Sequence, residues 1–229
     1  VALAGLGLAV WGCQEGAPAP PPAAQDGPQA GPETGPRRGG VLSFAVPSEP
    51  PSFDCHRENT FGCIHPIAPF YSLLVRFDQH NYPAIAPDLA RAWTVSDDGL
   101  RYTFTLHQGV RFHDGAPLSA RDVVASYEKV VFPPEGVVSP RKGSYLMVDS
   151  IHAADELTVV FTLKCPSPAF LANLASPWNF IYRADILEDD PHWYESNVNG
   201  TGAFRFVEYV SGSHLVGERF DDYFLDDRP

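Results

Sequence analysis

Apolar and polar positions alternate along several short stretches of the chain, a pattern typical of half-buried β-strands. In RYTFTLHQGVRF (101–112), Tyr102, Phe104 and Leu106 share one face, and two further apolar positions follow the turn formers HQG. This spacing predicts a hairpin or a bent strand.

Three other stretches have strand patterns. The apolar run VLSFAV (41–46) predicts a buried strand, and LTVVFTL (157–163) predicts another after an Asp-Glu turn. The segment GAFRFVEYVSGSHLVGERF (202–220) predicts two strands joined at SGS.

One stretch has the helical period together with a start signal. ARDVVASYEKVV (120–131) follows Ser119, and Ser119 with Asp122 forms a capping box for the first free amides of a helix. The apolar positions recur at helical spacing and define a buried face. That face comprises Val123, Val124, Tyr127 and Val130.

Two shorter helices are predicted with less regular patterns. PFYSLLVRFD (69–78) has apolar residues at helical intervals and a strand end at VRF. SPAFLANLA (167–175) can begin with Ser167 as the cap and Pro168 at the first helical position.

The stretch HDG before the capping box holds the residues that most suggest catalysis. Asp114 can bond its own backbone and Gly115 can take positive φ, which are the properties of a turn. Every polar residue here has a structural role, so we interpret His113 and Asp114 as a turn leading into the helix.

The first forty residues have a different composition. Residues 1–13, VALAGLGLAVWGC, are an apolar segment that matches the core of an export signal and is too short to span a bilayer. Cys13 is the expected site of lipidation; a secretory signal cut elsewhere is the alternative, and either predicts export. Residues 14–40 are rich in Pro, Ala and Gly and are interpreted as a tether.

Export permits disulfides. Cys55 and Cys63 lie close enough in sequence to close a small ring, which leaves Cys165 as a buried thiol by default. The alternative is a metal site built from Cys55, His56, Cys63 and His65, whose spacing matches no recognised pattern.

Charge and motifs exclude several function classes. The formal net charge is −12 and the sequence pI about 4.9, which argues against a nucleic-acid partner because phosphate contacts need clustered Lys and Arg. The chain has neither a G-x-S-x-G elbow nor an H-E-x-x-H pair. No catalytic residue, metal or cofactor is predicted.

The stretch PDLARAWTVSDDGLRYTFTLHQGVRFHDGAPLSARDVVASYEKV (87–130) closely resembles the family 5 extracellular solute-binding proteins, the capture subunits of ABC importers for oligopeptides, dipeptides and nickel. The elements P-x-LA-x-x-W, SDDG, YTF-x-L, GV-x-FHDG and A-x-DV occur in the family's order. The strand and helix at 157–175 and the segment GTGAF, with Ala203 where the family usually has proline, extend the resemblance over 41–229.

The resemblance implies an α/β fold of the two-lobed, type II periplasmic binding protein kind. The chain would supply only the first lobe, with an extra subdomain at about 51–185 and a return to the main lobe at about 198–229, and the second lobe would be missing. It implies a monomeric, non-enzymatic protein outside the cytoplasmic membrane, periplasmic or at the cell surface. Its partners would be a peptide or similar small solute, the permease subunits and, through its lipid anchor, the membrane.

By position in the family's first lobe, eight residues are candidates to line the ligand cleft. They are Ser48, Glu49, Asn59, Thr60, Phe61, Trp178, Asn179 and Phe180. Polar and aromatic side chains of this kind suit a partly apolar cleft, and ordinary loop packing is the alternative for each. A secreted hydrolase, and a sensory or chaperone module on the same fold, are the alternative functions.

Overall fold

The computed structural model describes residues 39–225. Its elements in chain order are α1 (Phe61–Ile67), η1 (Ala68–Phe70), β1 (Val75–Phe77), β2 (Ile85–Pro87), β3 (Ala90–Val95), β4 (Arg101–Leu106), α2 (Ala120–Val131), η2 (Lys142–Tyr145), β5 (Val148–Asp155), β6 (Thr158–Leu163), α3 (Phe170–Leu174), α4 (Ala184–Asp189), η3 (Trp193–Glu195), β7 (Phe204–Val210) and β8 (His214–Arg219). The described residues contain no helix that is both long and apolar enough to cross a membrane.

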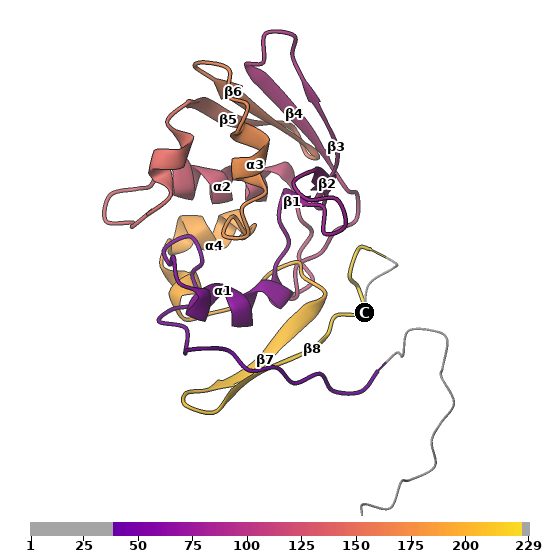
Figure 1. Cartoon of the computed structure of the whole chain (residues 1–229), viewed down its shortest axis with the longest axis vertical. Helices are drawn as coiled ribbons and strands as arrows, with labels where there is room; N and C mark the ends of the chain where they lie inside the picture. Colours follow the sequence, from indigo (N-terminus) through magenta and orange to yellow (C-terminus); the bar gives the residue numbers. More distant parts are fainter. Residues whose placement is uncertain (1–38, 226–229) are drawn as a thin grey trace, which may run out of the picture. The chain divides into compact units, whose positions relative to one another are not determined.

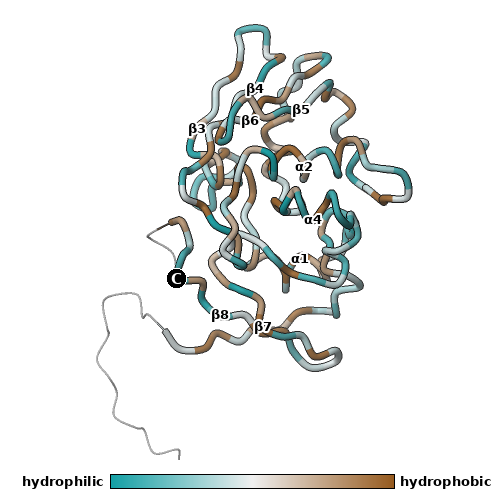
Figure 2. Tube along the Cα trace, turned by 180° about the vertical axis from the view of Figure 1, so that it is seen from behind, coloured by the Kyte–Doolittle hydropathy of each residue, from teal (hydrophilic) through white to brown (hydrophobic). Residues whose placement is uncertain are grey.

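A four-stranded antiparallel sheet and one helix build the larger hydrophobic core (Figure 1). The strand order is β3-β4-β6-β5, and Tyr102 of β4 lies opposite Phe161 of β6. Helix α2 packs on β5 and β6, where the ring of Tyr127 meets Phe161 edge-on at a centroid distance of 5.1 Å. Figure 2 shows hydrophobic residues along α2 and the adjoining strands.

The start of α2 confirms the prediction made from sequence. The Asp122 carboxylate accepts the Ser119 amide at 2.8 Å and the Ser119 hydroxyl at 3.0 Å. Three of the four predicted apolar residues, Val123, Tyr127 and Val130, are inside the core, and Val124 is half-buried against it. Because both signals lie within one short segment, local sequence alone is enough to place this helix.

A second hydrophobic cluster joins α1 and η1 to the segment that carries α4 and η3. Its centre is aromatic: Tyr71 stacks on Phe180 at 5.0 Å, and Tyr182 stacks on Tyr194 at 3.9 Å. Helix α4 in turn packs against α2. This cluster and the contact between α4 and α2 therefore hold residues 53–60 and α1 to the four-stranded sheet with α2, which we call the sheet subdomain.

The HDG turn is structural, as predicted. Gly115 has φ +88°, and the Asp114 carboxylate accepts the Ala116 amide at 3.1 Å. The His113 ring bonds the Gly202 carbonyl at 3.0 Å, on the segment that leads into β7. A Cβ on Gly202 would lie 2.4 Å from the backbone of Phe70, so this segment needs glycine for its close approach to η1.

The strand predictions are confirmed in the second half of the chain and partly in the first. β6 matches the expected strand, and β7 and β8 form the expected hairpin. β4 ends at Leu106, the chain turns at Gly109 (φ +80°), and the second arm pairs only through an isolated bridge between Arg111 and Pro117.

The buried strand predicted at 41–46 is wrong. No strand of the described chain pairs with this segment, and its side chains lie in solvent, with Val41 95% exposed. Strand hydrogen bonds must come from a neighbour, and an apolar pattern alone does not supply one.

The helix predicted within 69–78 is also wrong, although its strand end is confirmed as β1. The amides of Leu89 and Ala90 donate to the carbonyls of Leu73 and Leu74, at 3.0 and 2.9 Å. This pairing draws the segment into extended backbone. The α-helix in this part of the chain is α1, which ends at Ile67, before the predicted segment.

Two details near β6 differ from the prediction. Helix α3 begins at Phe170 with Ala169 as its N-cap, so Ser167 and Pro168 precede the helix; the Ser167 carbonyl accepts the Phe170 amide at 3.1 Å. Cys165 is exposed rather than buried, because it follows the end of β6 where the chain leaves the sheet.

Candidate functional site

The first two candidates, Ser48 and Glu49, lie against the start of α1. A Cβ on Gly62 would lie 2.3 Å from the Ser48 hydroxyl and 3.0 Å from the Glu49 carbonyl. The Glu49 carboxylate accepts hydrogen bonds from the Tyr209 and Ser211 hydroxyls, each at 2.9 Å. These bonds lower the pKa of Glu49 and attach the segment to the β7–β8 hairpin.

The middle three candidates, Asn59, Thr60 and Phe61, lie at the end of a loop whose base is buried. We call residues 54–60 the site loop. At its base the Asp54 carboxylate accepts the His56 amide at 2.9 Å, the Tyr182 hydroxyl at 3.1 Å and the Lys129 ammonium at 2.6 Å. Burial opposes the charge on Asp54, but the charge of Lys129 and the hydrogen bonds from Lys129 and from the His56 amide hold its pKa below the ordinary value.

Arg141 holds the other side of the site loop. Its guanidinium donates to three loop carbonyls, those of Cys55, His56 (2.7 Å) and Glu58 (2.8 Å). The Trp178 ring lies 5.2 Å from the same guanidinium, in cation–π geometry. Trp178 is half-buried. Its contact with Arg141 places this candidate aromatic residue beside the site loop.

His56 is held neutral inside the loop. Its Nε2 bonds the Phe180 carbonyl at 2.8 Å, and its ring lies 4.2 Å from that of Tyr182. Desolvation is the main cause that lowers the pKa of His56 to about 3. Since a carbonyl can only accept, Nε2 carries the proton, and Nδ1 has no hydrogen-bond partner.

The last two candidates are buried. The Asn179 side-chain amide donates to the Tyr145 hydroxyl at 2.7 Å and the Asn173 carbonyl at 2.8 Å. Phe180 lies in the second hydrophobic cluster, stacked on Tyr71. Asn179 therefore holds the turn after α3, and Phe180 packs in the cluster that also contains Cys55 and Cys63.

The structure therefore brings five of the eight candidates together as an exposed set, which we call the candidate face. It comprises Ser48, Glu49, Asn59, Thr60 and Phe61. Phe61 is 67% exposed and stacks on His65 with ring centroids 5.0 Å apart.

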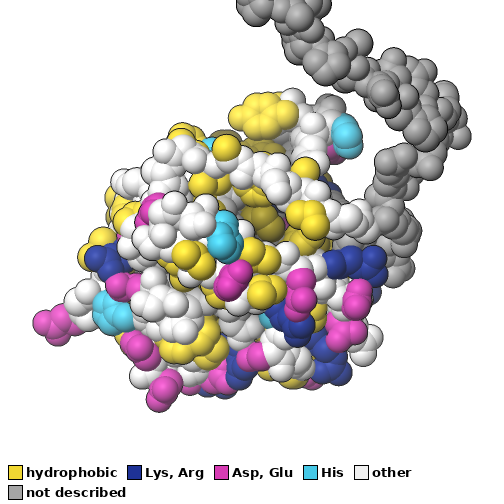
Figure 3. All heavy atoms as spheres, turned by 90° about the horizontal axis from the view of Figure 1, so that it is seen from below, with side chains coloured by type: hydrophobic (Ala, Val, Ile, Leu, Met, Phe, Trp, Pro, Cys, Tyr) yellow, Lys and Arg dark blue, Asp and Glu magenta, His cyan; other side chains and the backbone are white. Residues whose placement is uncertain are grey.

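Apolar groups are also exposed on nearby elements. The segment that enters the site loop, α1 and the β7–β8 hairpin lie together in the fold (Figure 1). Figure 3 shows hydrophobic side chains around a hollow on the face seen from that end. The large exposed hydrophobic residues of these elements are Val41, Leu42, Phe44, Val46, Phe61, Val207, Val210 and Val216.

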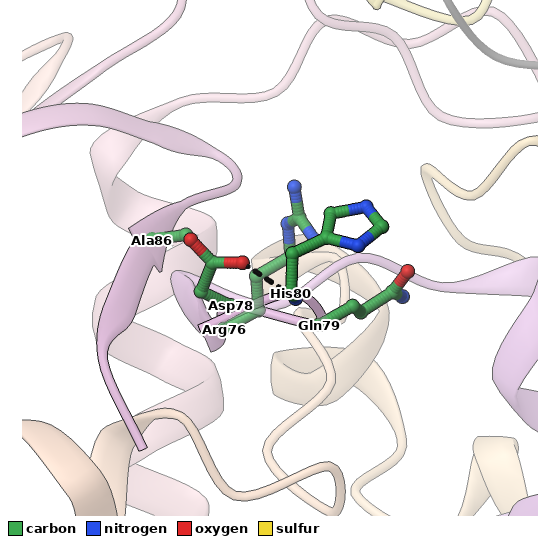
Figure 4. Close-up of a pocket in the computed structure, with 5 residues that line it drawn as sticks. All are labelled: Arg76, Asp78, Gln79, His80 and Ala86. Carbon is green, nitrogen blue, oxygen red and sulfur yellow. Dashed lines mark hydrogen bonds between the residues drawn. The ribbon is translucent and has the colours of Figure 1, made fainter. Parts of the chain in front are cut away.

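A surface hollow of about 480 Å³ lies elsewhere, at the connection between β1 and β2 (Figure 4). It is lined by Arg76, Asp78, Gln79, His80 and Ala86. The Asp78 carboxylate accepts the His80 amide at 2.8 Å, so it stabilises the turn. None of the eight candidates lines this hollow.

The side chains of Cys55, His56, Cys63 and His65 do not converge as a metal site. Within 39–225 no group of three or more His, Cys, Asp or Glu side chains is arranged to hold a metal ion. His65 is exposed and faces Phe61, whereas His56 is buried against Phe180.

Sequence reasoning missed the residues that hold the site loop: Asp54, Lys129, Arg141 and Tyr182. No signal in the sequence pointed to them: at 100° per residue, Lys129 lies on the other side of the predicted helix from Val123, Tyr127 and Val130. Lys129 is buried in the structure because α4 and the site loop also pack against α2. Its partner, Asp54, lies 75 positions away and no local pattern connects the two.

A mixed α/β scaffold that presents a loop of polar and aromatic residues is typical of ligand-binding proteins. Residues 84–229, more than half of the chain, match the model of the bacterial extracellular solute-binding proteins, family 5. The chain belongs to this family.

The relatives matched by sequence and by structure are also named as binding proteins. The glutathione-binding protein GsiB of Pectobacterium atrosepticum is 34% identical over 154 residues, which cover 67% of this chain and 29% of that protein. The periplasmic binding protein DppA from Helicobacter pylori, in complex with the peptide STSA, matches with TM-score 0.69 and 30% identity over 77% of this chain and 38% of that one.

A third match has a different ligand. The binding protein AgaA from A. tumefaciens R10, in complex with agropinic acid, matches with TM-score 0.70 and 29% identity, covering 78% of this chain and 35% of that one. The chain therefore spans about a third of the length of these relatives. The predicted fold class is confirmed for that part of the fold.

The predictions for the N-terminus concern residues outside the part of the chain that the structure describes. These are the signal segment 1–13, lipidation at Cys13 and nearly all of the tether 14–40.

Proposed function

We propose that the protein containing this chain is the capture component of an ABC importer and binds a peptide or similar small solute. The chain would supply the first lobe, with an extra subdomain at about 51–185 and a return at about 198–229. A second lobe would close over the ligand by hinge motion. Family membership and the solute-binding relatives support this proposal.

The observation that carries the proposal is the contrast within the site loop. Its base is fixed by a buried ion pair and by Arg141, while Asn59, Thr60 and Phe61 at its end are exposed. A binding loop fixed before the ligand arrives loses less conformational entropy on binding. Exposed amide, hydroxyl and aromatic groups suit a small solute with polar and apolar parts.

The eight candidates then divide into two roles. Ser48, Asn59, Thr60, Phe61 and Trp178 are the proposed ligand contacts. Glu49 holds the entering segment to the β7–β8 hairpin, Asn179 holds the turn after α3, and Phe180 packs against Tyr71. The exposed apolar residues at 41–46 suit burial against the remainder of such a receptor.

The proposed setting follows from the family and the composition. The protein would be exported, monomeric and lipid-anchored through Cys13 to the membrane, where it would deliver its solute to permease subunits. The N-terminal tether would leave the binding lobes mobile.

The test is ligand-induced stabilisation of the whole receptor. A panel of di- to tetrapeptides, glutathione and opine-type acids is screened for an increase in melting temperature, which reports binding to the native state. Phe61→Ala is expected to weaken the best hit about tenfold or more, which corresponds to about 1.4 kcal/mol. Leu146→Ala removes a similarly exposed side chain from the end of η2 and is expected to leave affinity unchanged.

The proposal fails if no member of the panel stabilises the protein, or if both variants bind equally well. Equal rates of uptake of the hit by cells with and without the receptor would contradict its role as the capture component for that solute.

A further inference from the structure

Two cysteine side chains, one from the site loop and one from α1, lie in contact. Cys55 is in the loop and Cys63 is the third residue of α1, and both side chains are fully buried. Their sulfur atoms are 3.1 Å apart in the free-thiol form. We propose that Cys55 and Cys63 are joined by a disulfide in the exported protein, closing a nine-residue ring that carries Asn59, Thr60 and Phe61.

Both cysteines are fixed by independent contacts. The Cys55 amide donates to the Tyr182 hydroxyl at 3.0 Å, and its carbonyl accepts from Arg141. The Cys63 amide donates to the Thr60 carbonyl at 3.0 Å at the start of α1. The two sulfurs are therefore adjacent because the surrounding fold places them there. Bond formation requires them to approach by about 1 Å, to the usual 2.05 Å.

Cys165 provides the contrast within the same chain. It is exposed, and it follows β6 rather than lying in the second hydrophobic cluster with the pair. It therefore serves as an internal reference thiol for every labelling experiment.

The bond would form by thiol–disulfide exchange. The two thiols lose two protons and two electrons, and a disulfide oxidant, such as oxidised glutathione, is reduced to two thiols. Burial raises the pKa of the Cys55 thiol, and neither sulfur is accessible once the loop has folded. The exchange would therefore occur while the loop is still open, and the finished bond would resist reductants until the protein unfolds.

Trypsin gives a direct test because it cleaves after Arg57, between the two cysteines. Protein exported to an oxidising compartment is unfolded without reductant, alkylated with iodoacetamide and digested. We expect peptides 39–57 and 58–76 to remain linked, with a mass two hydrogens below their sum, and to separate on reduction. The peptide that begins at Cys165 should carry the alkyl group.

Alkylation of both Cys55 and Cys63 in the unreduced protein would overturn the proposal, as would linkage of either one to Cys165. This result does not depend on any ligand, so it is separate from the outcome of the solute screen.

A second measurement uses stability. Replacing both Cys55 and Cys63 by Ala should lower the melting temperature of the oxidised protein by about 5–10 °C, the range expected for opening a short ring. Cys165→Ala should leave it unchanged. Reduction under unfolding conditions, followed by refolding with reductant present, should lower the wild-type melting temperature and leave the double variant unaffected. Equal sensitivity of the two proteins would contradict the disulfide.

Discussion

The Lys129 ammonium lies 2.6 Å from the Asp54 carboxylate, and the two side chains are only 4% and 2% exposed. Lys129 belongs to α2, in the sheet subdomain, whereas Asp54 begins the site loop. This buried ion pair is therefore a direct link between the scaffold and the candidate face.

Removing one partner of the pair should be costly. Lys129→Met leaves Asp54 buried without its counter-charge, which typically destabilises a protein by about 3–5 kcal/mol. The double variant Asp54→Asn, Lys129→Met removes both charges and should recover part of that loss. Urea unfolding of the single and double variants measures both effects. A loss below about 1 kcal/mol for Lys129→Met would show that the pair is not buried in solution.

Stability should fall in mild acid because of His56. Its pKa is about 3 in the folded protein, against about 6.5 in an unfolded chain, so the unfolded state binds more protons between these values. The contribution is complete above pH 6.5 and is lost as pH falls toward 3. His56→Gln should reduce the slope of stability between pH 6 and 4.5 by up to about 1.4 kcal/mol per pH unit.

The matched control is His152→Gln on the exposed side of β5. Its stability is measured over the same pH range as that of His56→Gln. Equal slopes for wild type and His56→Gln would contradict a neutral, buried His56.

Close packing at Gly202 should not tolerate a methyl group. Gly202→Ala would place a Cβ 2.4 Å from the Phe70 backbone, and overpacking of this kind costs about 1–3 kcal/mol. Gly143→Ala meets no atom within 4 Å and should be nearly neutral. Thermal unfolding compares the two. Equal melting temperatures would mean that the segment does not approach η1 closely.

Arg141 should control the rigidity of the site loop. Arg141→Met removes donors to three loop carbonyls, so hydrogen exchange in residues 55–61 should become at least tenfold faster. Arg121→Met, at an exposed ion pair with Glu188, is the control and should leave this exchange unchanged. Unaltered exchange in the Arg141 variant would show that the loop is held by other contacts.

Features specified within one short segment could be predicted from sequence. Helix α2 has its cap and its apolar face within 119–131, and the β7–β8 hairpin has two alternating strands around one turn. β3 was not predicted, because most of its residues are exposed and it pairs with β4 on one side only. The run 41–46 shows the opposite error: its apolar pattern predicted a strand, but no strand of the described residues pairs with it.

The candidate site also contains residues that could be predicted from the sequence and residues that could not. Asn59, Thr60 and Phe61 could be proposed from their place in the family pattern, and the structure exposes all three. The groups that fix them come from distant parts of the chain: Lys129 from α2, Arg141 before η2 and Tyr182 before α4. Only folding brings these groups together, so no local pattern could identify them.

The protein containing this chain is proposed to capture a small solute. Native mass spectrometry of the whole receptor, purified gently from its source cells, is a direct test of this proposal. We expect a monomer well above the 25.0 kDa of this chain, with a dissociable adduct of peptide or similar size that raises the melting temperature when added back. A receptor that carries no adduct and is stabilised by no peptide, glutathione or opine-type acid would contradict solute capture.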